Sequence, residues 1–225
     1  MRDQLICAGV SPLQIKVIPN PIPELFFNPS ERVTARRQLG LDINEKIILV
    51  IASSTSIDKR KGIDLIEPTM IQINKSDSNY RLVTVGIDSF DLNPKGIYHK
   101  ALEHVESEHE LVDIYTSADV VFVPSRLDNF PQVITQAQSL GLPVVAFDVG
   151  GISEAILFPE ISGKIIEPFS IKEAAEAIIF FLDSSNEIVR QVWATEALNR
   201  WSYSKIKNEF VQYIASLTIS GTTAP

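Results

Sequence analysis

Short apolar runs alternate with amphipathic stretches of helical period along most of the chain. The runs are mostly rich in β-branched side chains and end at turn-forming residues, which is typical of strands buried on both faces. They fall at residues 46–52, 81–85, 97–99, 120–123, 143–147 and 164–166. Because strands that alternate with helices pair in parallel, the pattern predicts the α/β class, with a doubly wound, Rossmann-like sheet of about six strands flanked by helices.

The helical stretches carry their own start and stop signals. They are predicted at residues 30–39, 61–74, 107–117, 131–140, 170–182, 187–200 and 205–217, and a further helix is expected to start at 152. Ser30 is expected to cap the first helix, and the Ser-x-x-Glu spacings that begin at Ser107 and Ser170 match a capping box. Pro68 should kink the second helix or divide it into short pieces.

The first residues do not fit this alternation. Residues 15–18 could form a strand, but prolines at positions 19, 21 and 23 follow at once and force an extended or turning path. The last residues are small and polar, and we expect them to fray. The predicted organisation is an interdomain linker at 1–27, one domain at 28–217 and a flexible tail at 218–225.

Composition and charge exclude several classes of partner. The 225 residues include 28 acidic and 20 basic side chains, and the net charge of −8 repels polyanions, so we expect no nucleic-acid partner. Cys7 is the single cysteine, and His99, His104 and His109 are not spaced to share one helical face, so we expect no metal site. The chain start does not match a secretory signal, and no apolar run is long enough to cross a bilayer, so we expect a cytoplasmic location.

A basic loop follows the first predicted strand. Residues 53–62 read SSTSIDKRKG, and their three basic side chains, Lys59, Arg60 and Lys61, lie at the predicted start of a helix. A helix N-terminus has free N–H groups and a partial positive charge, so with these bases beside it a phosphate could be held there. The alternative is a solvated turn whose bases only keep the protein soluble.

A second polar loop, residues 126–130, follows the strand predicted at 120–123. Asp128 precedes the next helix and could either cap it or serve a ligand. Gln132 and Gln136 lie one turn apart on the face away from the apolar stripe of that helix, where most polar side chains only meet solvent. Because the carboxyl ends of parallel strands share one edge of a sheet, we expect both loops at the edge where open sheets bind ligands.

Four motifs in these loops and strands resemble one protein family. They are Arg60-Lys61-Gly62, Pro124-Ser125-x-x-Asp128-Asn129-Phe130-Pro131, Gly141-x-Pro143-Val144-Val145-Ala146 and Gly150-Gly151-x-x-Glu154. In this order they resemble the carboxyl-terminal domain of retaining glycosyltransferases of the family 4 type, which have the GT-B fold. The resemblance spans about residues 18–213 and implies that the chain is one half of a fold with two Rossmann-like domains facing across a cleft.

The resemblance implies that this half, residues 28–217, binds a nucleoside-diphosphate sugar as donor substrate. A separate N-terminal domain or subunit would bind the acceptor, a glycan or lipid-linked glycan, and would complete the active site. The implied activity is hexosyl transfer with retention of anomeric configuration, as in polysaccharide biosynthesis, without a metal or other cofactor. The chain alone would then be inactive, and any peripheral association with a membrane would be made through the other domain.

By position, the implied catalytic residues are Lys61 and Asp128. Lys61 would neutralise the diphosphate with help from Arg60, and Asp128 would hold a hydroxyl of the transferred sugar. Gln136 would face the ribose hydroxyls, and Gly86 would lie close under the nucleotide. The other implied donor-binding residues are Ser53, Asn129, Phe130, Pro131, Gln132 and Val133. Backbone N–H groups around Phe130, Gln132 and Val133 would meet sugar and phosphate oxygens, whereas Pro131 has no N–H group.

Three departures from the family pattern leave a second function open. Gln136 stands where the family has Glu, and an amide in place of a carboxylate should weaken donor binding about tenfold. Ser53 stands where many members have Arg, and the acceptor-binding domain is not part of the sequence. The alternative is a degenerate, non-catalytic module of the same fold that serves as a binding or regulatory partner. A sugar-nucleotide epimerase is a third reading, but it would need acids and histidines from a facing domain.

Overall fold

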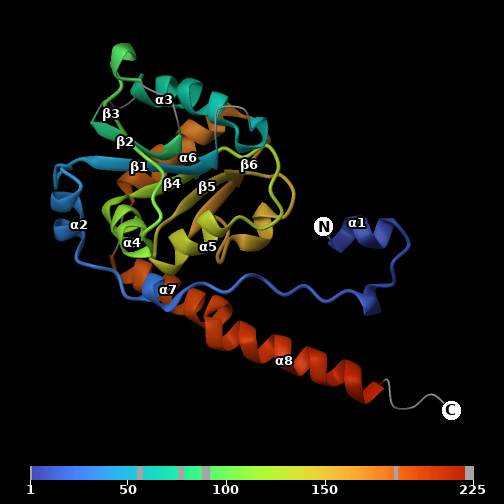
Figure 1. Cartoon of the computed structure of the whole chain (residues 1–225). Coiled ribbons are helices and arrows are strands. Elements are labelled where there is room, and N and C mark those ends of the chain that lie inside the picture. Colours follow the sequence, from blue (N-terminus) through green and yellow to red (C-terminus); the bar gives the residue numbers. More distant parts are fainter. Residues whose placement is uncertain (1, 55–57, 76–78, 88–91, 185–186, 221–225) are drawn as a thin grey trace.

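The computed structural model describes residues 2–54, 58–75, 79–87, 92–184 and 187–220 (Figure 1). Six strands form one parallel sheet in the order β3-β2-β1-β4-β5-β6. Their bounds are β1 Lys46–Ser54, β2 Tyr80–Ile87, β3 His99–Leu102, β4 Val120–Val123, β5 Val144–Phe147 and β6 Gly163–Ile166. The predicted doubly wound α/β sheet is confirmed.

The strand order reverses between β1 and β4. The chain moves outward from β1 through β2 to β3 and then returns to the other side of β1, where Ile48 pairs with Val120 and Leu49 with Val121. A reversal of this kind opens a crevice outside the carboxyl ends of the two central strands. The segments that follow β1 and β4 are therefore brought to that crevice.

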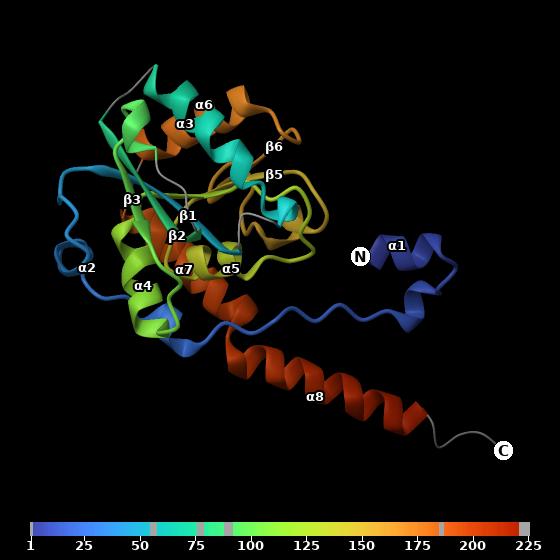
Figure 2. The same ribbon diagram turned by 45° about the horizontal axis from the view of Figure 1, so that its top comes forward.

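Helices cover both faces of the sheet (Figures 1 and 2). Their bounds are α2 Arg32–Gln38, α3 Ile66–Asn74, α4 Glu108–Ser117, α5 Gln132–Ser139, α6 Ile171–Asp183 and α7 Glu187–Trp201. Side chains of α4, α5 and α7 form one hydrophobic core, and those of α3 and α6 form the other. Successive residues of β1 alternate between them, Ile47 and Leu49 in the first core and Ile48 and Val50 in the second, as the period of a strand requires.

Both ends of the chain extend away from the sheet (Figures 1 and 2). A short helix, α1 Arg2–Cys7, begins the chain, and a long one, α8 Tyr203–Ser220, follows α7. Residues 15–18 form no strand and run extended; Lys16 Nζ pairs with Glu209 of α8 at 2.6 Å. No helix in the described ranges is both long and apolar enough to span a bilayer.

The predicted boundaries of the linker and the tail differ from the structure. Ile22 and Phe26 are fully buried, and the Ile22 N–H donates to the carbonyl oxygen of Trp201 at 2.8 Å, so the predicted linker joins the domain from Ile22 onward. At the other end α8 continues to Ser220, three residues past its expected end at 217. Residues 221–225 of the predicted tail lie outside the described residues.

The predicted caps have different outcomes. The cap at Ser107 is confirmed, since its Oγ accepts a bond from the backbone N–H three residues later at 3.4 Å. Ser170 precedes α6 but makes no side-chain bond to its first turn. The cap at Ser30 is wrong: Glu31 is the N-cap of α2, and the Ser30 hydroxyl donates to Asp113 Oδ1 at 2.6 Å. The Ser30 hydroxyl therefore makes a tertiary hydrogen bond in place of the local capping bond that its position before the helix predicted.

The helix predicted at 61–74 is divided into short pieces, as one of the two expectations had it, but the division lies at Gly62 and not at Pro68. Two 3-10 turns, Lys59–Lys61 and Ile63–Leu65, precede α3, because Gly62 between them takes a left-handed backbone with a φ of 63°. Pro68 lies in the first turn of α3, where a helix tolerates proline. The helix expected from 152 is a single 3-10 turn, Ile152–Ala155, and β3 begins two residues later than predicted.

A buried ionic cluster closes the amino-terminal edge of the sheet. Asp119 precedes β4, and its Oδ2 accepts bonds from Arg36 Nη2 at 2.8 Å and from the Ile47 N–H at 2.7 Å, while its Oδ1 accepts one from Arg32. The Arg36 side chain is 3% exposed; burial lowers the pKa of its guanidinium, and the Asp119 carboxylate opposes that shift. Because so deeply buried a charge needs its partner, Asp119 ties α2 to the starts of β1 and β4.

Replacing Asp119 with alanine should lower the free energy of unfolding by about 3–5 kcal/mol, because Arg36 would remain buried without its counter-ion. Urea unfolding followed by circular dichroism measures the loss. The exposed pair of Arg200 with Glu196 provides the control, and Glu196→Ala should cost no more than about 0.5 kcal/mol. Similar losses in the two variants would show that the buried cluster does not hold this edge together.

Candidate functional site

Lys61 and Asp128 meet at the crevice between β1 and β4. Lys61 ends the 3-10 turn that follows β1, and Asp128 lies in the loop that follows β4. Lys61 Nζ lies 3.1 Å from Asp128 Oδ2, and the two side chains are 34% and 17% exposed. The structure thus brings the two predicted catalytic residues into contact at the edge where ligands bind in this topology.

Gly62 determines how closely the loops after β1 and β4 approach each other. A Cβ atom built on Gly62 would lie 1.9 Å from the carbonyl oxygen of Pro124, far inside contact distance. The Arg126 N–H also donates to the Arg60 carbonyl oxygen at 2.7 Å, and this bond joins the same two loops. Only glycine fits at this approach, so backbone packing places Lys61, the residue before it.

The loop after β5 supports the backbone of Asp128 and Asn129. A Cβ atom on Gly150 would lie 2.0 Å from the Asp128 carbonyl oxygen, and one on Gly151 would lie 1.9 Å from that of Asn129. The Gly151 N–H also donates to the Asp128 carbonyl oxygen at 3.0 Å. Backbone contacts among three loops therefore position the pair of Lys61 and Asp128.

Arg60, the expected helper of Lys61, is engaged by a neighbour on its own loop. Its Nε and Nη2 each donate to the Asp58 carboxylate at 2.9 Å. These bonds raise the pKa of Arg60 and lower the pKa of Asp58. The Arg60 side chain is 70% exposed, so the pair is weak, and the guanidinium would have to leave Asp58 to reach an anion beside Lys61.

Among the described residues, no side chain caps the start of α5. Its N-cap is Pro131, and Asp128, which could have capped the helix, pairs with Lys61 instead. The N–H groups of Gln132 and Val133 lie in the first turn, where a helix has no acceptor of its own to offer them. A helix start of this kind carries a partial positive charge and is suited to hold an anion.

The other predicted residues of this loop differ in exposure. Asn129 and Gln132 are exposed, Phe130 and Val133 are partly buried, and Pro131 is buried. The Phe130 ring packs edge-on against Trp201, with ring centroids 6.4 Å apart. Its side chain therefore packs against the core and anchors the loop.

Gly86 and Ser53 lie at the same edge of the sheet. Gly86 is the next-to-last residue of β2 and has a φ of 68°. Ser53 lies near the end of β1, where the pairing with β2 is irregular between Ile51 and Ser54. The Ser53 side chain and residues 55–57 of the predicted basic loop lie outside the described residues.

Gln136 is not the purely solvent-facing side chain that its place on the helix indicated. It is partly buried, and its Oε1 accepts a bond from the Tyr115 hydroxyl of α4 at 3.0 Å. The sequence pattern did not single out Gln138, which is fully buried and joins α5 to the segment between β5 and β6: its Nε2 donates to the Ser162 carbonyl oxygen at 3.1 Å and its Oε1 accepts from the Leu157 N–H at 2.8 Å. Gln138 follows the buried Ile134 by one helical turn, and this position on the apolar stripe could have indicated that its side chain is buried.

The described residues of the site offer charge and hydrogen bonds to a ligand. Within the ranges that the structure describes, no group of three or more His, Cys, Asp or Glu side chains is arranged to hold a metal ion. His99 bonds to Thr84 Oγ1 at 2.8 Å inside the sheet. An ammonium, a carboxylate and a helix start together suit a ligand that is anionic at one end and carries hydroxyl groups at the other.

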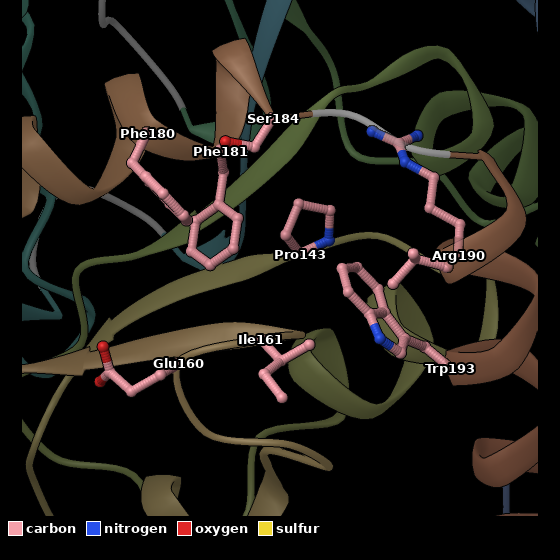
Figure 3. A pocket seen from close by; sticks show the side chains of 9 residues that line it. Pro143, Glu160, Ile161, Phe180, Phe181, Ser184, Arg190 and Trp193 are labelled. Atoms are coloured by element: carbon pink, nitrogen blue, oxygen red, sulfur yellow. The ribbon is translucent and has the colours of Figure 1, made fainter.

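A separate pocket of about 210 Å³ lies at the opposite edge of the sheet (Figure 3). It is lined by Phe180 and Phe181 of α6, Trp193 of α7 and Pro143, which precedes β5. The lining is mostly apolar, and none of the predicted site residues takes part. This pocket is therefore distinct from the crevice that holds Lys61.

Comparisons with known proteins agree with the architecture. A family model described as glycosyl transferases group 1 matches residues 31–200. A D-inositol 3-phosphate glycosyltransferase of Segniliparus rotundus is 30% identical over 173 residues, which are 72% of this chain and 38% of that protein. One of Catenulispora acidiphila is 31% identical over 198 residues, 80% of this chain and 46% of that protein. The chain thus spans less than half the length of these relatives.

Solved structures share the fold. Sucrose-phosphate synthase from Thermosynechococcus elongatus aligns with a TM-score of 0.75 and 22% identity, over 97% of this chain and 57% of that one. The Anabaena HepE protein, solved in complex with UDP, aligns with a TM-score of 0.79 and 20% identity, over 96% of this chain and 61% of that one. At these identities the likeness shows the fold, and the sheet domain is one half of a GT-B architecture.

Replacing Gly62 with alanine should lower the free energy of unfolding by more than about 2 kcal/mol, because the methyl group would meet the Pro124 carbonyl while the backbone stays left-handed. Gly96 is a matched control: its φ is 74° and the space around it is open, so Gly96→Ala should cost only about 1 kcal/mol. Urea unfolding compares the two. Equal losses would contradict the close approach of the two loops.

Proposed function

We propose that this chain, which belongs to the family of group 1 glycosyl transferases, is the donor-binding half of a retaining, family 4-type glycosyltransferase. It binds a nucleoside-diphosphate sugar at the crevice between β1 and β4. It then supports transfer of the hexose to a glycan or lipid-linked glycan when an acceptor-binding half completes the cleft, and it is inactive without that half.

The observation that carries the proposal is the pair of Lys61 and Asp128 beside the uncapped start of α5. A diphosphate would be met by the Lys61 ammonium and by the N–H groups of the helix start, whose dipole adds to the attraction. A sugar hydroxyl would donate to the Asp128 carboxylate in a charge-assisted bond. The ion pair of the free protein would thereby be replaced by two contacts with one ligand.

Sugar transfer demands stabilisation of the departing nucleoside diphosphate. Negative charge develops on it as the bond to the sugar breaks, and groups already aimed at that charge lower the barrier most. Lys61 meets this requirement because the approach of Gly62 to Pro124 positions its backbone before any ligand arrives. The proposal needs no metal, since Lys61 and the helix start supply the positive charge.

The compared proteins support a nucleotide sugar as donor. The Anabaena HepE protein was solved with UDP and with UDP-glucose, and the curated relatives are named as glycosyltransferases. These comparisons do not bear on the acceptor, because the matched region covers less than half of those relatives. Acceptor choice would belong to the remaining part of the enzyme.

We place the docking surface for the acceptor-binding half on α8 and the segment that runs along it. A groove of about 560 Å³ lies between residues 16–21 and α8, and α8 projects from the sheet domain (Figure 1). Large apolar side chains on α8, each 45–55% exposed, recur at helical spacing: Phe210, Val211, Ile214 and Leu217. Apolar side chains exposed together mark an interaction surface. The acceptor-binding half would dock here, either as another domain of the same protein or as a separate subunit. Both halves would be located in the cytoplasm, and any contact with a membrane would be made by the acceptor-binding half.

A second candidate function is a non-catalytic module of the same fold. Two observations favour it: Gln136 presents an amide where the resembling family has a carboxylate, and Arg60 is engaged by Asp58. Such a module would bind no nucleoside diphosphate and would act through the surface of α8. Ligand binding therefore separates the two functions.

Saturation with the correct nucleoside diphosphate should stabilise the chain. At a hundred times the dissociation constant the gain is about 2.7 kcal/mol, which is a rise in melting temperature of roughly 5–10 °C for a domain of this size. Differential scanning fluorimetry with UDP, GDP, ADP and dTDP measures it. A panel in which none raises the melting temperature would contradict the proposed function and favour the non-catalytic module.

Two variants of the basic turn make the same assay specific. Lys61→Ala should abolish the rise, because it removes the ammonium at the crevice. Lys59→Ala removes an equal charge from an exposed position on the same turn and should leave the rise within about 1 °C of that of the unaltered chain. Equal effects of the two substitutions would mean that the loop attracts anions only by its overall charge.

A further inference from the structure

Gln136 is held in one orientation by a residue from another helix. It lies on the second turn of α5, one turn after Gln132, and its Oε1 lies 3.0 Å from the Tyr115 hydroxyl on α4. An amide can accept only through its oxygen, so the Tyr115 hydroxyl donates to Oε1. Within the described residues the two N–H groups of Gln136 Nε2 make no hydrogen bond, so they remain for another partner.

The Tyr115 hydroxyl is a dependable donor. The residue is fully buried, and this burial raises the pKa of its phenol, so the group stays protonated over the whole physiological range. The second acceptor near it, the Val133 carbonyl oxygen, lies at 3.5 Å, the limit of a hydrogen bond. Its single proton therefore goes to Gln136.

Packing fixes the position of the Tyr115 ring. The ring meets Phe26 edge to face, with centroids 6.0 Å apart and planes at 69°, and Phe26 is itself fully buried. An aromatic ring enclosed in this way cannot swing its hydroxyl away from α5. The orientation of the Gln136 amide is thus set by the core of the domain and not by a ligand.

We propose that Tyr115 is a positioning residue for nucleotide recognition: by engaging Oε1 it turns the Nε2 donors of Gln136 toward the bound nucleotide. The inference rests on the proposed function and deepens it. A carboxylate at this place would accept bonds from ribose hydroxyls, whereas the oriented amide donates to an oxygen acceptor of the ribose. Gln136 then recognises the nucleotide as a hydrogen-bond donor, where a carboxylate would be an acceptor, and its presence does not mean that the site has lost its function.

A double-mutant cycle on UDP binding, measured by isothermal titration calorimetry on the whole chain, tests the coupling. Tyr115→Phe should weaken UDP binding about fivefold, the effect of one lost hydrogen bond, and less than twofold when Gln136 is already alanine. A purely structural role of the hydroxyl would give the same loss in both backgrounds, and that result would overturn the inference. If the unaltered chain binds no UDP or other nucleoside diphosphate, the proposed function fails and this inference fails with it.

Tyr80→Phe is the matched control for loss of a buried hydroxyl. The Tyr80 hydroxyl donates to the Met70 carbonyl oxygen at 2.8 Å in the other core, so its removal should reduce stability without changing UDP affinity. If Tyr80→Phe weakened UDP binding as much as Tyr115→Phe does, the effect of both substitutions would come from lost stability alone, and the inference would be overturned.

Nuclear magnetic resonance tests the direction of the amide. The Gln136 side-chain N–H signals are those that disappear from the spectrum of the nitrogen-15-labelled Gln136→Ala variant. In the unaltered chain they should shift when UDP is added, because the Nε2 donors meet the ligand. In Tyr115→Phe they should move toward the position of a free glutamine amide before UDP is added. Signals that respond to neither change, in a chain that does bind UDP, would overturn the inference and leave the proposed function standing.

Discussion

The close approach of backbone segments at the carboxyl edge of the sheet is the constraint on which the candidate site depends. Gly62 lies against the Pro124 carbonyl, and the paired glycines of the loop after β5 lie against the carbonyls of Asp128 and Asn129. Because these contacts join main-chain atoms, they hold Lys61 and Asp128 together in the free protein. Charged groups whose backbone is positioned before binding cost less to reorganise when a ligand arrives, and the proposed diphosphate site depends on this.

The two edges of the sheet use ion pairs in opposite ways. At the amino-terminal edge Asp119 is enclosed with Arg36 and joins elements of the core, so its pairing contributes to stability. At the carboxyl edge the pair of Lys61 and Asp128 remains partly exposed and can exchange partners. The overall charge of −8 gives no attraction for anions, so an anionic ligand must be recognised by this local arrangement.

Much of the fold could be predicted from the sequence, because buried parallel strands leave apolar runs that periodicity reveals, and strands that alternate with helices pair in parallel. The placement of the loops after β1 and β4 at one edge of the sheet could be predicted for the same reason, whereas the order of the strands could not, because more than one doubly wound order fits the same alternation. The turn at Gly62, the engagement of Arg60 by Asp58 and the bond from Tyr115 to Gln136 could not, since each depends on which atoms the tertiary structure brings within reach.

The most direct measurement is a crystal structure of the chain grown with UDP. The account predicts the diphosphate at the start of α5, with a phosphate oxygen about 3 Å from Lys61 Nζ and the bond from Lys61 to Asp128 lengthened or broken. A nucleotide bound in the apolar pocket beside Trp193, or anywhere that leaves the pair of Lys61 and Asp128 as it is in the free protein, would contradict it.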